Sequence, residues 1–348
     1  MNFKTLNRRF GILTISSVFL LLIAGGVVRS TGSGMGCPDW PKCFDGYTPP
    51  TNINQLPTNY RDVYVEKRVK KTIKFAKLMH KLGFEKEADQ LLNDPVLYLP
   101  EDFNTKKAWT EYINRIIGVL SGLFSLGFFI TLFKTRFYSH KTKFWTGIGG
   151  FVLMLFNGWL GSIVVATNLF PIIVTIHYLL AYAALTLLMI SVLEARGNES
   201  TQILLKYKWF YLFLILFSLV QISYGTQLRQ LSDFSLKNGS LYTNGQVNLQ
   251  TLGSVFIWHR IFAIALILFS IFPIIQLRKL KDKKWRNIAL AIPVTFIIQY
   301  ISGILNLRYN FPFVPQVSHI FFAGVVFGLS LYICISNFSS QNNASNLG

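Results

Sequence analysis

The sequence predicts an all-α, polytopic membrane protein whose eight transmembrane helices form two pseudosymmetric four-helix bundles. Three observations predict this fold class. Hydrophobic residues make up 51% of the 348 residues, against 14% charged residues, and the mean hydropathy is +0.41. Eight apolar runs approach the roughly 20 residues that a helix needs to cross a bilayer. The two halves of the chain also repeat one pattern of glycine, histidine and arginine positions.

The first apolar run follows a short basic head and has no small-residue cleavage site, so we expect it to be retained as a helix. The head also lacks the Arg- and Ser-rich stretch of a mitochondrial transit peptide, which favours a bacterial plasma (inner) membrane. The eight expected spans are residues 11–28, 110–133, 145–167, 172–194, 208–228, 253–277, 287–307 and 314–336.

The net charge of +19 lies mainly between the apolar runs. The connections 134–143, 196–208 and 278–286 are basic, whereas 168–171 and 308–312 carry almost no positive charge. By the positive-inside rule, this distribution predicts that both termini are cytoplasmic. No stretch combines a basic patch with base-stacking aromatic residues on a soluble domain, so we expect no nucleic-acid partner.

The connection from about residue 30 to 108 also carries many lysines, but loops this long largely escape the positive-inside rule. Its first part is rich in turn-forming residues. Its second part, 60–92, has apolar residues at helical spacing among lysines, which predicts a basic amphipathic helix on the lipid surface. These apolar residues are Val69, Ile73, Ala76 and Leu82. The second outer connection, about 230–252, predicts no element.

The internal repeat is clearest around two histidines. Gly161 precedes His177 by the same interval as Gly303 precedes His319. Segment 111–115 aligns with 256–260, and segment 25–29 aligns more loosely with 225–229. An even number of spans separates each matched pair, so the two units have the same orientation. The predicted units are residues 1–200 and 201–348.

The even-numbered spans all run from outside to inside, which places four polar residues at one level near the outer leaflet. They are Asn114, His177, His259 and His319. Imidazoles on facing helices suit the axial positions of haem iron, and ionisable residues inside a membrane are usually functional. The alternative is a pair of histidines that hydrogen-bond helix to helix. Zinc or copper is a weaker prediction, because no third nitrogen or thiolate ligand accompanies them.

Three charged residues near these positions each have two interpretations. Arg115 and Arg260 can pair with the propionates of a haem, or they can extend to water or lipid phosphate. Glu111, three residues before Asn114, can move protons or stabilise a developing cation. It can equally serve as a first-turn acid at a helix N-terminus.

Cys37 and Cys43 lie in the long outer connection, on the oxidising side of the membrane. A disulfide that staples the loop is the first interpretation, and a redox-active dithiol that passes electrons is the second.

These residues together resemble the heme A synthase family of eight-span membrane enzymes. The resemblance lies in segment 25–34, in the CPDWPKC segment 37–43, in Glu111 with Arg115, in His177, and in Trp258-His-Arg260 with His319. It implies that His259 and His319 hold haem b, and that the N-terminal half binds the substrate haem O. It also implies oxidation of a ring methyl of haem O, through hydroxylation steps, to the formyl group of haem A for terminal oxidases. A haem O synthase would be the upstream partner, and the electron acceptor or donor is unknown. In the family, the glutamate at the position of Glu111 is essential.

The sequence departs from the family at one position. Where the family usually has E-x-x-H-R, this chain has Asn114, so only His177 of the expected N-terminal pair is present. Asn is a poor iron ligand. The hypothesis is that Asn114 hydrogen-bonds a species on the open face of the substrate iron.

Two rival functions remain at this point. A di-haem electron-transfer cytochrome would keep both haems unchanged. A haem transporter or delivery protein would also suit an internal repeat, although the polar residues gather near one face and form no path of charges through the midplane.

Overall fold

The computed structural model describes residues 3–135, 141–193, 207–237, 239–243, 246–273 and 283–344. It confirms the predicted all-α membrane architecture, because eight helices in these ranges are long and apolar enough to cross a bilayer. The eight helices are α1 (Phe3–Ser30), α4 (Thr105–Thr135), α5 (Lys141–Ala166), α6 (Pro171–Val192), α8 (Lys208–Lys237), α9 (Gly253–Ile271), α11 (Lys283–Arg308) and α12 (Phe313–Ala344).

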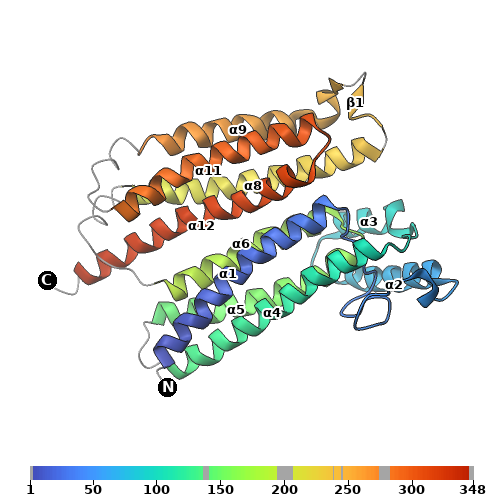
Figure 1. Ribbon diagram of the computed structural model, residues 1–348, viewed down its shortest axis with the longest axis horizontal. Helices are drawn as coiled ribbons and strands as arrows, with labels where there is room; N and C mark the ends of the chain where they lie inside the picture. Colours follow the sequence, from blue (N-terminus) through green and yellow to red (C-terminus); the bar gives the residue numbers. More distant parts are fainter. Residues whose placement is uncertain are drawn as a thin grey trace.

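The helices form two bundles that lie side by side (Figure 1). In the first, α4 packs against α1 and α5, and α6 packs against the same two helices. In the second, α9 packs against α8 and α11, and α12 packs against the same two. The helices that carry the candidate residues, α4 with α6 and α9 with α12, therefore lie diagonally across their bundles. The symmetry relation of the two bundles and the boundary between residues 200 and 201 remain predictions.

The bundles meet where α1 packs against α12 and where α6 packs against α8 and α12. Buried apolar residues of all four helices form the largest core cluster there, including Leu185, Leu214 and Phe327. Small residues bring α12 close to α1, because a Cβ on Gly324 would lie 2.4 Å from Leu22 Cδ1. Such close packing holds helices together in lipid, where there is little hydrophobic driving force between them.

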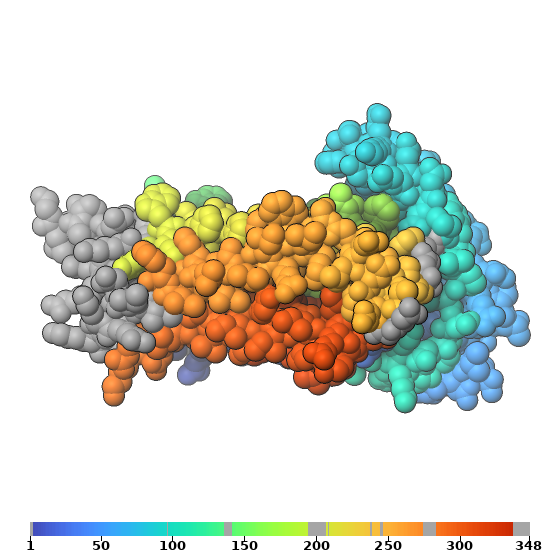
Figure 2. All heavy atoms as spheres, turned by 90° about the horizontal axis from the view of Figure 1, so that it is seen from above, coloured from blue at the N-terminus to red at the C-terminus, as the bar shows by residue number. Residues whose placement is uncertain are grey.

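Both chain ends lie at one end of the bundles, and the long loop with α2 and α3 lies at the other (Figure 1). In Figure 2 the atoms of this loop project beyond the helices at that end. The basic connections predicted for the opposite side fall largely on residues 136–140, 194–206 and 274–282, outside the described ranges, as does the end of the predicted span 253–277.

The predicted amphipathic helix over 60–92 is wrong in one respect. It is two helices, α2 (Tyr60–Lys81) and α3 (Glu85–Leu92), because the chain turns at Gly83 with φ +85°. The contact of this segment with the lipid surface stays a prediction: of its four apolar residues, only Ala76 is buried within the protein. The buried residues of α2 are Tyr60, Tyr64, Arg68, Thr72, Ala76 and Met79.

Polar side chains lie on the buried face of α2 because backbone carbonyls accept their hydrogen bonds. Arg68 donates to the carbonyls of Leu97 and Leu99, at 2.9 and 2.5 Å from Nη2, and Thr72 Oγ1 donates to Ala166 O at 2.6 Å. Helix α2 is thereby bonded to the rest of the loop and to the end of α5.

The second outer connection is also more ordered than predicted. Helix α8 continues to Lys237, supported by the i,i+4 ion pair between Arg229 and Asp233. After it, β1 (Tyr242–Thr243) and β2 (Gln246–Val247) pair as a short antiparallel ribbon.

Candidate functional site

The three histidines of the described spans occupy equivalent places in their helices. Each lies six residues after the first residue of its helix: 171 to 177 in α6, 253 to 259 in α9 and 313 to 319 in α12. With a rise of about 1.5 Å per residue, each imidazole is about 9 Å from its helix start. Asn114 lies nine residues into α4, deeper than the predicted first two turns, because α4 begins at 105 and not near 110.

His259 and His319 face each other across the second bundle. Their ring centroids are 6.3 Å apart, with 53° between the ring planes. Two imidazoles on one iron atom place their ring centres about 6 Å apart, given metal–nitrogen bonds of about 2.0 Å. The pair therefore fits the two axial positions of a haem.

The hydrogen bonds of His319 leave one ring nitrogen available for a metal. Its Nδ1 lies 2.9 Å from the carbonyl oxygen of Gln299 and 3.1 Å from Ser302 Oγ. When Nδ1–H donates to a carbonyl, the lone pair is on Nε2, which is the usual state of a ligating histidine. Nδ1 of His259 is buried and has no hydrogen-bond partner.

A glycine on the preceding helix makes room for each imidazole. A Cβ built on Gly161, Gly225 or Gly303 would lie 3.2 to 3.4 Å from Cε1 of the facing histidine. Four residues before each glycine stands an amide residue: Asn157, Gln221 and Gln299. The predicted repeat included the glycines but not the amide residue four positions before each of them. An alignment of the two halves on these glycines would have shown the amide-x-x-x-Gly pattern.

The fourth place of the repeat, in α1 and α4, has neither the histidine nor the amide residue. If the predicted repeat holds, the fourth place pairs Gly25 of α1 with Asn114 of α4, and Leu21 stands where the other three sites have an amide residue. A Cβ on Gly25 would meet nothing within 4 Å, so this glycine borders open space. His177 has a buried Nδ1 without a hydrogen-bond partner. The first bundle thus offers one imidazole where the second offers two.

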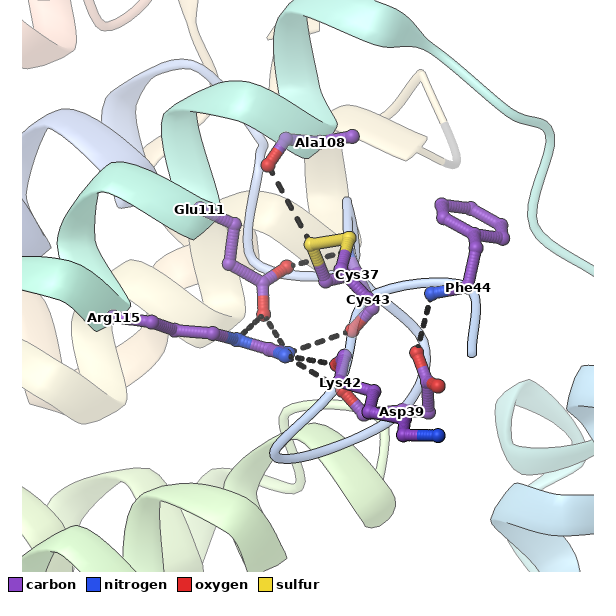
Figure 3. A network of polar contacts seen from close by, with 8 residues as sticks. All are labelled: Cys37, Asp39, Lys42, Cys43, Phe44, Ala108, Glu111 and Arg115. Atoms are coloured by element: carbon purple, nitrogen blue, oxygen red, sulfur yellow. Dashed lines mark hydrogen bonds and ion pairs between the residues drawn. A yellow bond between two sulfur atoms is a disulfide. The ribbon is translucent and has the colours of Figure 1, made fainter. Parts of the chain in front are cut away.

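Glu111 is 3% exposed and lies in a polar network with the long loop that precedes α4 (Figure 3). The backbone N–H of Cys37 donates to Glu111 Oε2 at 2.8 Å. Arg115 donates to Glu111 Oε1 from Nη2 at 2.5 Å and from Nε at 3.1 Å. The predicted disulfide between Cys37 and Cys43 is present, and both residues are buried.

The remaining donors of Arg115 go to the loop. They reach the carbonyls of Cys37 at 2.8 Å, Asp39 at 2.6 Å and Lys42 at 2.8 Å. Arg115 thus binds Glu111 and the loop, which is neither of the two contacts predicted for it. Arg260, the other predicted propionate partner, has an exposed side chain on α9.

Helix α2 supports this loop from outside the membrane. Asp45 lies between Lys67 Nζ, at 2.6 Å, and Tyr64 Oη, at 3.1 Å. The hydrogen bond from Lys67 holds the pKa of Asp45 below its usual value. Burial, with the nearby carboxylate of Asp45, raises the pKa of the Tyr64 hydroxyl, which therefore stays protonated.

Among the described residues, no group of three His, Cys, Asp or Glu side chains is placed to hold a metal ion. The chemistry that these residues offer is thus a two-imidazole site, a one-imidazole site, and a buried carboxylate tied to a disulfide loop.

Comparison with known proteins finds one family model and two named relatives that match this chain. Residues 8–331 match the family model COX15-CtaA, described as cytochrome oxidase assembly protein. A heme A synthase of Shewanella oneidensis is 28% identical over 190 residues, which are 54% of this chain and 46% of that protein. A heme A synthase of Pelagibacter ubique is 27% identical over 163 residues, 45% of this chain and 40% of that protein. The matched segments span less than half the length of these relatives.

Proposed function

Because the chain belongs to the COX15-CtaA family of cytochrome oxidase assembly proteins, we propose that it is a heme A synthase. This membrane oxidoreductase would oxidise a ring methyl of haem O, through hydroxylation steps, to the formyl group of haem A. The observation that carries the proposal is the pair of imidazoles, His259 and His319, whose ring centres are 6.3 Å apart. Two relatives that are named heme A synthase support it.

We assign the resident cofactor, haem b, to His259 and His319. When bound, it supplies a one-electron carrier whose potential follows from its axial ligands. The residues of this chain orient the site: the Gln299 carbonyl fixes the tautomer of His319, and Gly225 and Gly303 leave space for the two rings.

The substrate haem O is assigned to the first bundle, with His177 as the iron ligand. Asn114, on the diagonal helix, would hydrogen-bond a species bound to the substrate iron. The Glu111 carboxylate is held by Cys37 N–H and by Arg115. A fixed anion of this kind stabilises positive charge that develops on the substrate, or accepts a proton from it.

The same proposal includes the membrane location of the protein and its partners. The protein would lie in a bacterial plasma membrane with both termini cytoplasmic, so that the loop and its disulfide are outside. It would receive haem O from a haem O synthase and exchange electrons with a further redox partner.

The test is extraction and chromatography of the haems from protein coexpressed with a haem O synthase, beside a His259→Ala variant. Haem A, or its hydroxylated precursor, in the native protein and its loss in the variant are expected. Unmodified haem B alone, with haem O demonstrably present, would indicate an electron-transfer cytochrome. Absence of any haem would indicate a transporter.

A further inference from the structure

Two arginines and one aspartate form an ionic cluster between the bundles. Asp233 of α8 is bonded to Arg29, at the end of α1, and its Oδ1 lies 2.9 Å from Arg229 Nη2. The three side chains are 24 to 32% exposed. Because one carboxylate faces two guanidinium groups, the cluster keeps a net positive charge.

Arg229 has hydrogen-bond donors that no acceptor in the protein uses. Its Nε and Nη1 atoms are buried and have no hydrogen-bond partner. Among the described residues, it is the only lysine or arginine with buried donors in this state. An unpaired buried donor is unfavourable, and more so on a charged group inside a membrane span. An anionic ligand at this place would accept a charge-assisted hydrogen bond from one of these two atoms.

The position of Arg229 indicates which ligand that is. It lies one turn after Gly225, whose Cβ position is 3.2 Å from the His259 ring. Its guanidinium lies over the ring of Phe311, 4.2 Å from the centroid. Phe311 is in the turn that leads into α12, the helix of His319. Arg229 is therefore at the outer end of the two-imidazole site, between the helices that carry both histidines.

We propose that Arg229 binds a carboxylate of the ligand held by His259 and His319, which is a propionate of the resident haem, and that Asp233 with Arg29 positions the guanidinium for this contact. The inference rests on the proposed function, which supplies the haem. It gives Arg229 the role that the sequence indicated for Arg260 and Arg115. Through Arg29 it also ties the haem site of the second bundle to the first helix of the other bundle.

Redox titration of the resident haem tests the proposal without haem A formation. A positive charge beside the haem favours the reduced state, so Arg229→Gln is expected to make the midpoint potential more negative. Asp233→Asn removes a negative charge and is expected to shift the potential in the opposite direction. If these residues had only a structural role, the two substitutions would not shift the midpoint potential in opposite directions.

Haem retention is the second measurement. Loss of a charged hydrogen-bond pair is expected to speed transfer of haem to apomyoglobin roughly tenfold in Arg229→Gln. Arg229→Lys keeps the charge without the planar guanidinium, so the haem potential is expected to stay near that of the native protein while the haem dissociates faster. This second variant also serves if Arg229→Gln folds poorly.

The matched control is Arg308→Gln, which removes one exposed arginine at the outer end of α11. It is expected to change neither measurement. A native potential and native retention in Arg229→Gln would overturn the proposal, as would equal shifts in the control or a large shift only in Arg260→Gln. A protein that binds no haem would overturn the proposed function itself, together with this inference.

Discussion

Asn114 distinguishes the two candidate sites at the level of single residues. Three imidazoles in the structure lie against a glycine with an amide residue one turn earlier, and the fourth place has Asn114, Gly25 and Leu21. The fourth place therefore lacks both the histidine and the amide residue that the other three have. A site with one imidazole leaves one face of an iron for chemistry, whereas a site with two imidazoles suits electron transfer.

Asn114→His is expected to add a second imidazole to the substrate site, because Gly25 borders open space that can receive the ring. The optical spectrum of protein loaded with haem O should change to that of a two-histidine haem. Ile113→His, on the exposed side of α4, is the control and should leave the spectrum unchanged. Equal or higher activity in Asn114→His, with an unchanged spectrum, would remove the special role of Asn114.

Glu111 and Arg115 of α4 together bind the loop that carries Cys37 and Cys43. Arg115 makes contacts to one carboxylate and three backbone carbonyls, which a lysine with a single ammonium group cannot reproduce. The buried disulfide next to it is protected only while the loop is docked.

Arg115→Lys is therefore expected to loosen the loop and to expose the disulfide between Cys37 and Cys43. Its reduction by dithiothreitol, followed by thiol labelling and mass spectrometry, should be about tenfold faster, since a loss of roughly 1.4 kcal/mol raises the open population tenfold. Lys42→Gln keeps the backbone carbonyl that Arg115 uses, so it serves as the control. An unchanged reduction rate in Arg115→Lys would contradict the proposed docking.

At the scale of elements, α2 shows how side-chain partners decide which face is buried. Its sequence favours an apolar stripe at Val69, Ile73 and Leu82, but Arg68 and Thr72 are buried because carbonyls from residues 97, 99 and 166 accept their hydrogen bonds.

Arg68→Met keeps the bulk of this side chain but leaves the Leu97 and Leu99 carbonyls without their donor, which lowers local stability by about 1–3 kcal/mol. Limited trypsin digestion in detergent should cut the loop 60–104 several times faster than in the native protein. Lys70→Met, at an exposed site of the same helix, is the control. Equal digestion rates for the two variants would show that Arg68 does not anchor α2.

At the scale of the whole molecule, the contact between the bundles depends on small residues of α12. Gly324 faces Leu22, and Gly328 faces Phe19, at 2.4 and 2.8 Å from a built Cβ. Their G-x-x-x-G spacing puts both on one side of the helix, which lets the backbones approach.

Gly324→Leu is expected to separate α12 from α1, since overpacking of a tight contact lowers stability by about 1–3 kcal/mol. Thermal unfolding in detergent, followed by haem loss, should occur several degrees lower. Gly122→Leu on α4, where a Cβ meets nothing within 4 Å, is the matched control and should unfold at the native temperature. Equal midpoints for the two variants would rule out this interface as a source of stability.

The sequence by itself determined the eight spans, their order, the common depth of His177, His259 and His319, and the cysteine pair. These features depend on the lengths of apolar runs and on spacing within single helices, which the local chain encodes. Only the tertiary structure decided that the loop takes up the donors of Arg115, that α2 buries polar residues, and that Arg229 keeps free donors beside the two imidazoles. Each of these depends on contacts between residues far apart in the chain, such as Cys37 with Glu111, and no local pattern specifies which carbonyl or ring a long side chain will meet.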